Sequence, residues 1–193
     1  ALSVARGEAG VRLAAGVNAE LPPLGLPGNA FGVELVGGEI GPSGADRIAF
    51  TFAPNPGEPP RPLARVASGG EASRLALALK VVLAGADETP LLVFDEIDAG
   101  IGGRNAAALG ERLRDLARYH QVLCVTHMPQ IAAYADAHVL VGKRVDADRT
   151  FTVARRLSDE ERAAELAAML GGEGAGDEAQ AAAQALLRGA ADG

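Results

Sequence analysis

The first 22 residues carry apolar side chains at every fourth position, at Leu13, Val17 and Leu21. This spacing places the three side chains on one face of a helix, and the two prolines that follow end it, since proline lacks the amide that a helix needs. The pattern predicts a helix over residues 1–22. Two interpretations stay open for it: the end of a coiled-coil arm, or an ordinary amphipathic helix.

Two pairs of strand-like runs occur farther along the chain. The first pair, 31–36 and 47–52, flanks a segment rich in glycine at 37–44, and this arrangement predicts a small β-hairpin. Two further strands are expected at 139–142 and 151–153.

Two other runs, 91–94 and 122–125, are apolar throughout, and a segment with helical periodicity, 104–119, lies between them. A strand, a crossover helix and a second strand of this kind indicate a parallel sheet that helices cover on both faces. The sequence therefore predicts an α/β fold with a largely parallel sheet. Further helices are expected from residue 68 onward, over 158–170 and over 177–187.

Polar residues follow directly after these two apolar runs. Asp95 and Glu96 follow the first, and His127 follows the second. The carboxyl ends of parallel strands meet at one edge of the sheet, which is where ligands bind in such folds. We therefore expect the two carboxylates and the imidazole to lie at the same edge.

The pair Asp95-Glu96 has the form of a Walker B motif. ATP hydrolysis needs one carboxylate that holds Mg²⁺, usually through water, and a second group that positions or deprotonates the attacking water. The alternative is a pair of solvated acids at the end of a strand. Their position after a buried-strand pattern favours the functional interpretation.

A second motif, Ser68-Gly69-Gly70-Glu71, opens the helix expected from residue 68. It is a capping box, with Ser68 as the cap and Glu71 reaching back to it. Two glycines in a first turn are unfavourable, by roughly 1 kcal/mol each relative to alanine. An anion that approaches the bare amides at the positive end of the helix would account for them. Capping and phosphate binding are compatible.

The three histidines and the single cysteine differ in the roles that their positions suggest. His127 can donate a hydrogen bond to a γ-phosphate at the ligand edge, whereas His120 and His138 are interpreted as structural or exposed. Cys124 lies in an apolar run and is expected to be a buried, unreactive side chain. No spacing typical of zinc ligands joins it to the histidines.

The composition limits the classes of protein to consider. The 193 residues hold 25 acidic and 18 basic side chains, a net charge of −7, so the chain lacks the positive charge of a protein that grips DNA over its whole surface. A local basic patch stays open. No run is long enough for a membrane helix, and no signal peptide is recognised. No G-x-x-x-x-G-K-[ST] phosphate loop occurs, and a chain without one is not a complete P-loop ATPase.

The order of these motifs resembles that of ABC-type ATPase heads, with a signature at 67–71, Walker B at Asp95-Glu96, then a D-loop turn and a switch histidine at His127. In the SMC-like branch of these ATPases, the Walker A motif lies in an N-terminal segment, separated by a long coiled coil. Within that branch the chain is similar to the RecN family of bacterial DNA-repair proteins over nearly its whole length. The segments that carry this similarity are 55–59, 66–71, 94–103 and 121–130.

The resemblance implies that Asp95 holds Mg²⁺, that Glu96 is the general base, and that His127 contacts the γ-phosphate and the attacking water. Residues 1–22 would end a coiled-coil arm, and residues 23–193 would form the C-terminal half of the head. Its partners would be the Walker A half of the same protein and a second, identical head.

The second head would be joined through ATP. The residues implied to bind the nucleotide of the opposite head are Ser68, Gly69 and Gly70, with Glu71 beside them, and Asp98 is assigned a contact role in the D-loop. The assembled protein would act on DNA in recombinational repair of double-strand breaks, in the cytoplasm at the nucleoid.

Two positions depart from the pattern of the wider superfamily. Ala67 stands where leucine is commonest, and Gly102 stands at the usual D-loop aspartate. The alternatives are a head from another SMC-like protein or a transporter, and a scaffold whose nucleotide site has decayed.

Overall fold

A computed structural model describes residues 1–55, 57–65, 69–146, 149–172 and 174–192. The motif residue Ser68 and the capping box expected from it therefore lie outside the described residues. The chain divides into two compact units, Ala1–Val125 and Thr126–Gly193. The division does not fall at residue 22, because the first helix packs within the first unit; its continuation into a coiled-coil arm stays a prediction.

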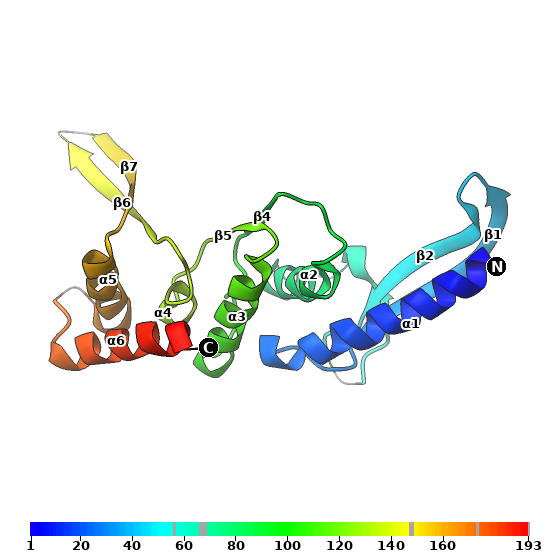
Figure 1. The fold of residues 1–193 in the computed structure, drawn as a ribbon, viewed down its shortest axis with the longest axis horizontal. Helices are drawn as coiled ribbons and strands as arrows, with labels where there is room; N and C mark the ends of the chain where they lie inside the picture. The colour runs from blue at the N-terminus through cyan, green and yellow to red at the C-terminus, as the bar shows by residue number, and fades with distance from the viewer. Residues whose placement is uncertain (56, 66–68, 147–148, 173, 193) are drawn as a thin grey trace. The chain divides into compact units, whose positions relative to one another are not determined.

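The first unit combines helices with two small sheets (Figure 1). Its elements in chain order are α1 (Leu2–Glu20), η1 (Pro22–Leu24), β1 (Phe31–Gly41), β2 (Gly44–Phe52), β3 (Arg61–Pro62), η2 (Leu63–Arg65), α2 (Gly69–Leu83), β4 (Leu91–Phe94), α3 (Gly103–Leu116) and β5 (Gln121–Cys124).

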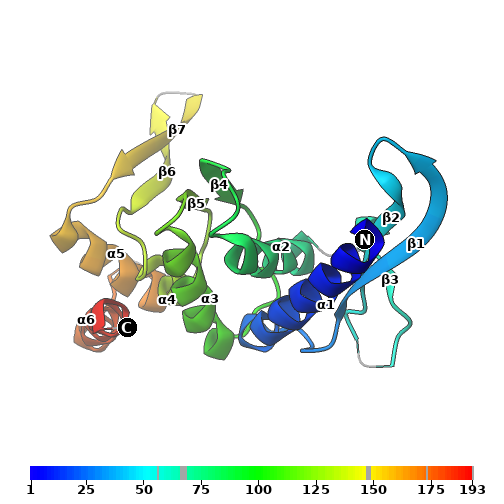
Figure 2. The same ribbon diagram turned by 45° about the vertical axis from the view of Figure 1, so that its right-hand side comes forward.

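The helix predicted at the N-terminus is α1, and it lies along β1 and β2 (Figures 1 and 2). The side chain of Asn18 fixes it there, because its amide donates to Phe31 O at 2.8 Å and its oxygen accepts from Phe31 N at 3.0 Å. Val17 and Leu21 are fully buried, as the apolar stripe predicted. The interior of this unit also contains Phe52.

The hairpin β1–β2 is longer than the sequence indicated. The strands pair from Phe31–Phe52 to Gly41–Gly44, with a register shift between Gly37 and Gly41. The turn expected over 37–44 is therefore wrong in extent, and only two residues separate the strands. Glycine suggests a turn because it accepts unusual backbone angles, but it also accepts the extended conformation of a strand.

The runs expected to form a parallel sheet do so as a single pair, with Leu91 of β4 opposite Gln121 of β5 and the register kept to Phe94–Cys124. The other described sheets, β1–β2–β3 and the β6–β7 pair of the second unit, are antiparallel. The α/β class is confirmed, and the parallel part is smaller than expected.

Only one face of the β4–β5 pair is covered by the described residues. Leu92 and Phe94 are buried, whereas Val93 and Leu123 are 58% and 53% exposed. The prediction that helices cover both faces is wrong for the described residues, which cover only one side of this apolar pair. We call the uncovered side chains the open face; they are Leu91, Val93, Leu123 and Val125.

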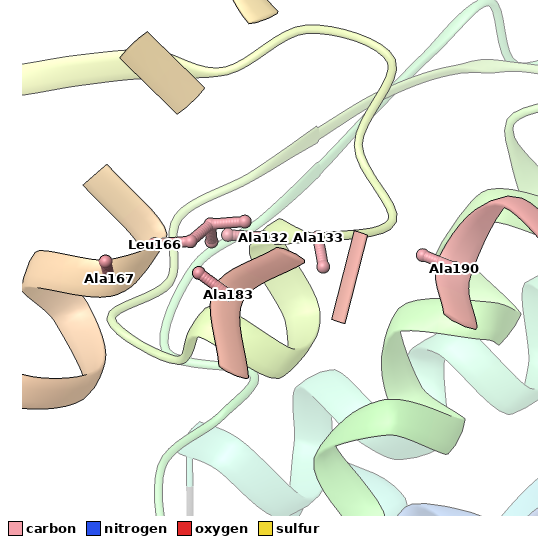
Figure 3. Close-up of a cluster of buried hydrophobic side chains, with 6 residues drawn as sticks. All are labelled: Ala132, Ala133, Leu166, Ala167, Ala183 and Ala190. Carbon is pink, nitrogen blue, oxygen red and sulfur yellow. The ribbon is translucent and has the colours of Figure 1, made fainter. Parts of the chain in front are cut away.

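The second unit contains α4 (Pro129–Ala132), β6 (Val139–Asp146), β7 (Arg149–Arg156), α5 (Asp159–Gly171) and α6 (Asp177–Asp192). Its core joins α4, α5 and α6 through small side chains around Leu166, as the six labelled residues of Figure 3 show. The N-terminus of α5 carries a complete capping box, in which Ser158 Oγ accepts from Glu161 N at 3.3 Å and Glu161 Oε2 accepts from Ser158 N at 2.8 Å. The expected helices 158–170 and 177–187 are thus confirmed.

The hairpin β6–β7 pairs Val139 with Arg156 and continues to Asp146–Arg149. Every residue of β7 is exposed, and so is most of β6. The strands form a two-stranded sheet of their own. No helix of the described residues is long and apolar enough to span a bilayer.

Candidate functional site

The two carboxylates lie in a turn that begins where β4 ends. Both are exposed, and Asp95 Oδ1 accepts a hydrogen bond from the amide of Glu96 at 2.9 Å. The turn is closed by its own backbone, since Ala99 N donates to Glu96 O at 3.0 Å and Ile101 N donates to Asp98 O at 3.1 Å. Two carboxylates are thus presented side by side on an ordered backbone; we call residues 95–101 the acidic turn.

Glu96 has an unusual backbone. Its φ is 55°, and among the described residues it is the one non-glycine with a positive φ. The left-handed conformation costs roughly 1–2 kcal/mol for a residue with a side chain. Such strain persists where the surrounding structure enforces it, and it concentrates at functional sites.

The glycines that begin α2 lie against the acidic turn. A Cβ built on Gly69 would be 3.0 Å from Glu96 Oε2, and one built on Gly70 would be 2.6 Å from Ala99 O. The positive end of the α2 dipole therefore adjoins the Glu96 carboxylate. The structure brings together two of the motifs that the sequence singled out, across more than 20 residues of chain.

Side chains from the next turn of α2 bind the same segment. Ser73 Oγ donates to Asp95 O at 3.2 Å, and Arg74 Nη1 donates to Ile97 O at 3.2 Å and to Ala99 O at 2.7 Å. Arg74 is only 5% exposed. Burial lowers the pKa of Arg74, and the charge of the nearby Glu71 acts in the opposite direction.

Sequence reasoning did not identify Arg74. A signal was present, because Gly70, Arg74 and Ala78 are four residues apart and share one face of α2, and all three are buried. A charged residue on the buried face of a helix is rare unless it has partners.

The other predicted site residues have different surroundings. Asp98 is buried, with 6% of its surface exposed. Its contact role in the D-loop stays a prediction. Its charge and that of Asp95 add to the main effect, burial, which raises the pKa of Cys124 to about 12. Cys124 is half-buried rather than fully buried as the sequence predicted, and its thiol stays protonated at neutral pH.

His127 belongs to the second unit. It follows Val125, whose amide donates to Phe94 O at 2.9 Å and extends the β4–β5 ladder by one residue. Thr126 Oγ1 then accepts from Met128 N at 3.0 Å, which turns the chain into α4. His127 is exposed; its place beside the two carboxylates stays a prediction. His120, by contrast, is buried, and its Nδ1 lies 2.6 Å from Thr89 O, which agrees with a structural role.

Comparison with known proteins identifies the family. No protein-family model matches the chain. The DNA repair protein RecN of Streptomyces coelicolor is 46% identical over 200 residues, which cover 97% of this chain and 35% of that protein. RecN of Xylella fastidiosa strain 9a5c is 44% identical over 190 residues, covering 97% of this chain and 34% of that protein. The segment belongs to the RecN family.

A further RecN relative, from Mycobacterium tuberculosis strain H37Rv, is 44% identical over 207 residues, covering 96% of this chain and 35% of that protein. The segment described here spans about a third of the length of the curated relatives it matches.

Solved structures show the fold of this segment. The Smc head domain of Pyrococcus yayanosii, with its coiled coil and joint, matches with a TM-score of 0.53 and 21% identity over 80% of this chain and 28% of that one. The Smc head domain of Pyrococcus furiosus, bound to the C-terminal domain of ScpA, matches with a TM-score of 0.50 and 19% identity over 80% of this chain and 36% of that one. The segment has the fold of part of an SMC-type head.

Proposed function

We propose that this segment supplies the hydrolytic carboxylates and the signature helix of an SMC-like, ATP-hydrolysing head that acts in bacterial DNA repair. The observation that carries the proposal is the contact between the acidic turn and the start of α2, where Gly69 lies against Glu96. The family name of the relatives supports a role in DNA repair. We further propose that the assembled protein acts in recombinational repair of DNA double-strand breaks at the nucleoid.

In this proposal Asp95 holds Mg²⁺ and Glu96 accepts a proton from, or orients, the attacking water. Among the described residues no group of three or more His, Cys, Asp or Glu side chains forms a metal cage. Mg²⁺ fits an exposed carboxylate without such a cage, because it keeps several waters and takes further oxygens from phosphates. The ion would neutralise charge that develops on the phosphoryl oxygens.

The roles of the other motif residues complete the proposal. His127 would donate a hydrogen bond to the γ-phosphate. The amides of Gly69 and Gly70, with Ser68 and Glu71, would bind the nucleotide held by the opposite head, so that ATP joins two identical heads. DNA would be bound by the assembled protein.

The open face supports a second part of the proposal, that another segment of the same protein completes the head. Leu91, Val93, Leu123 and Val125 are between 47% and 58% exposed, and all-apolar strands of a parallel pair are normally covered on both faces. About two thirds of the length of the matched relatives lies outside this segment. We propose that the Walker A segment lies there and covers the open face.

The test is Glu96→Gln in the intact protein, with Glu88→Gln as the matched control. Glu88 is exposed and precedes β4. Loss of a general base lowers turnover by about 10²–10⁴-fold, so Glu96→Gln should retain ATP binding and lose most hydrolysis, while Glu88→Gln keeps both. Equal turnover in the two variants would remove Glu96 from the mechanism and favour a scaffold with a decayed nucleotide site.

A further inference from the structure

Two side chains of α2 bind the acidic turn from outside it, Ser73 at its first residue and the buried Arg74 farther along. Arg74 Nη1 donates to two backbone carbonyls of the turn, at 3.2 Å to Ile97 O and 2.7 Å to Ala99 O. These carbonyls lie one and three residues beyond Glu96. A donor that bridges them fixes the path of the chain immediately after the residue with positive φ.

We propose that Arg74 is the positioning residue of this site, holding the acidic turn so that Glu96 keeps its left-handed backbone and its carboxylate stays against the start of α2. The inference rests on the proposed function, in which Glu96 acts on water. Arg74 does not touch the nucleotide in this proposal; it acts through the carbonyls of the turn.

Burial removes water from the Arg74 guanidinium, so protein groups must replace its hydration. The guanidinium is 5% exposed, and its Nε has no hydrogen-bond partner, so the two carbonyls and the nearby charge of Glu71 replace its lost hydration. A buried cation is retained only where its surroundings compensate for desolvation. Here the compensating groups belong to the turn that carries the two carboxylates.

Gly70, four residues before Arg74, contributes to the same contact between α2 and the acidic turn. Ala99 O, the carbonyl bound at 2.7 Å by Arg74, would be only 2.6 Å from a Cβ at Gly70. The missing side chain therefore lets the turn approach the helix closely enough for Arg74 to reach it. In this arrangement Gly70 and Arg74 couple the signature helix to the hydrolytic carboxylate of the same head.

The experiment measures steady-state turnover and ATP affinity in the intact protein for Arg74→Met, which keeps an unbranched side chain but removes the guanidinium and with it both hydrogen bonds to the turn. A positioning error of this kind can lower turnover by about 100-fold, so we expect a loss of about 10- to 100-fold with ATP affinity nearly unchanged. The matched control is Arg112→Met in α3. Arg112 is half-buried and pairs with Glu20 at 2.5 Å and with Asp115 at 3.6 Å, both outside the acidic turn. Its loss should affect stability and not turnover.

A double-mutant cycle separates positioning from general destabilisation. If Arg74 acts through Glu96, adding Arg74→Met to Glu96→Gln should lower turnover by less than about twofold further, because groups that act as a unit are not additive. Full additivity, or wild-type turnover in Arg74→Met, would overturn the inference. If Arg74→Met does not fold, Arg74→Lys takes its place, because it keeps the charge on a shorter side chain; wild-type turnover in that variant would count against the inference equally.

The cycle also distinguishes this inference from the proposed function. Failure of the proposed function appears as normal turnover in Glu96→Gln itself. Failure of the inference alone appears as slow turnover in Glu96→Gln with normal or additive behaviour at Arg74.

Discussion

Alanine at Gly70 has no room for its methyl group. The added Cβ would lie 2.6 Å from Ala99 O, 3.0 Å from Arg74 Nη1 and 3.1 Å from Ala99 Cβ, and the nearest of these atoms is backbone that cannot swing aside. Overpacking of a filled site costs typically 1–3 kcal/mol. Alanine recovers roughly 0.5–1 kcal/mol through its better helix propensity. The difference between the midpoints of these two ranges is a net loss of about 1 kcal/mol.

The matched control is Gly69→Ala, one position earlier in the same helix. Its Cβ would meet only Glu96 Oε2, at 3.0 Å, which is the end of a flexible side chain that can move. Gly69→Ala should therefore avoid the overpacking cost and keep the gain in helix propensity, so its stability should be unchanged or raised by up to about 1 kcal/mol. For a protein of this size a loss of 1 kcal/mol lowers Tm by about 2–4 °C, so the two variants should differ by several degrees.

Thermal unfolding gives the global difference, and hydrogen exchange of residues 95–101 locates it. The amides of Ala99 and Ile101 are bonded within the turn and should exchange faster in Gly70→Ala than in Gly69→Ala. Equal melting temperatures and equal exchange in the two variants would show that the approach of Gly70 to Ala99 O is not tight, and the coupling of α2 to the acidic turn would lose its basis.

Three further predictions concern other parts of the chain. Hydrogen bonds from Lys80 and Thr89 lower the pKa of Asp87 below its usual range. A carboxylate whose pKa is lower in the folded protein stabilises the fold above its unfolded pKa of about 4, and this stabilisation is lost as the pH falls. The stability lost in Asp87→Asn should therefore be constant at neutral pH and shrink below about pH 4, as denaturation at several pH values would show. Leu166 is fully buried, so Leu166→Ala should cost about 2–5 kcal/mol in denaturant unfolding; Leu170→Ala, at a 38% exposed position of the same helix, should cost much less, and equal costs would contradict the assigned core. Cys124 is half-buried and its pKa is raised to about 12, so a thiol reagent at pH 8 should label the native protein more slowly than the unfolded protein, and equal rates would contradict this shielding.

Much of the fold follows from local pattern, because each apolar run reports its own surroundings. The stripe of Val17 and Leu21 predicted α1 and its buried face, and the runs 91–94 and 122–125 predicted the parallel pair. Turn extent was less accessible. The glycines within 37–44 are compatible with both a turn and an extended strand, and pairing across the hairpin decides between them.

The acidic turn shows where local pattern is insufficient. The sequence identified Asp95, Glu96 and Gly70 as candidate site residues, but it did not identify the arginine that links α2 to the acidic turn. Arg74 makes its bonds to residues 23 and 25 positions away, and a long-range bond from a buried cation leaves no periodic trace. The open face was not predicted for a different reason. An all-apolar strand indicates that both of its faces are buried, but the pattern does not say which segment of the protein packs on each face.

The exposed hairpin β6–β7 determines where the second unit first opens and is cut by proteases. Its strands bond to each other, and its side chains are almost all in solvent, while the helices α4, α5 and α6 share a buried cluster. A two-stranded sheet without a covering face is marginal in water, and regions with few buried contacts open at the lowest free energies. Unless a neighbouring segment shields it, the hairpin would open in many excursions for each global unfolding event, leaving the helical cluster intact, and proteases would cut the second unit there first.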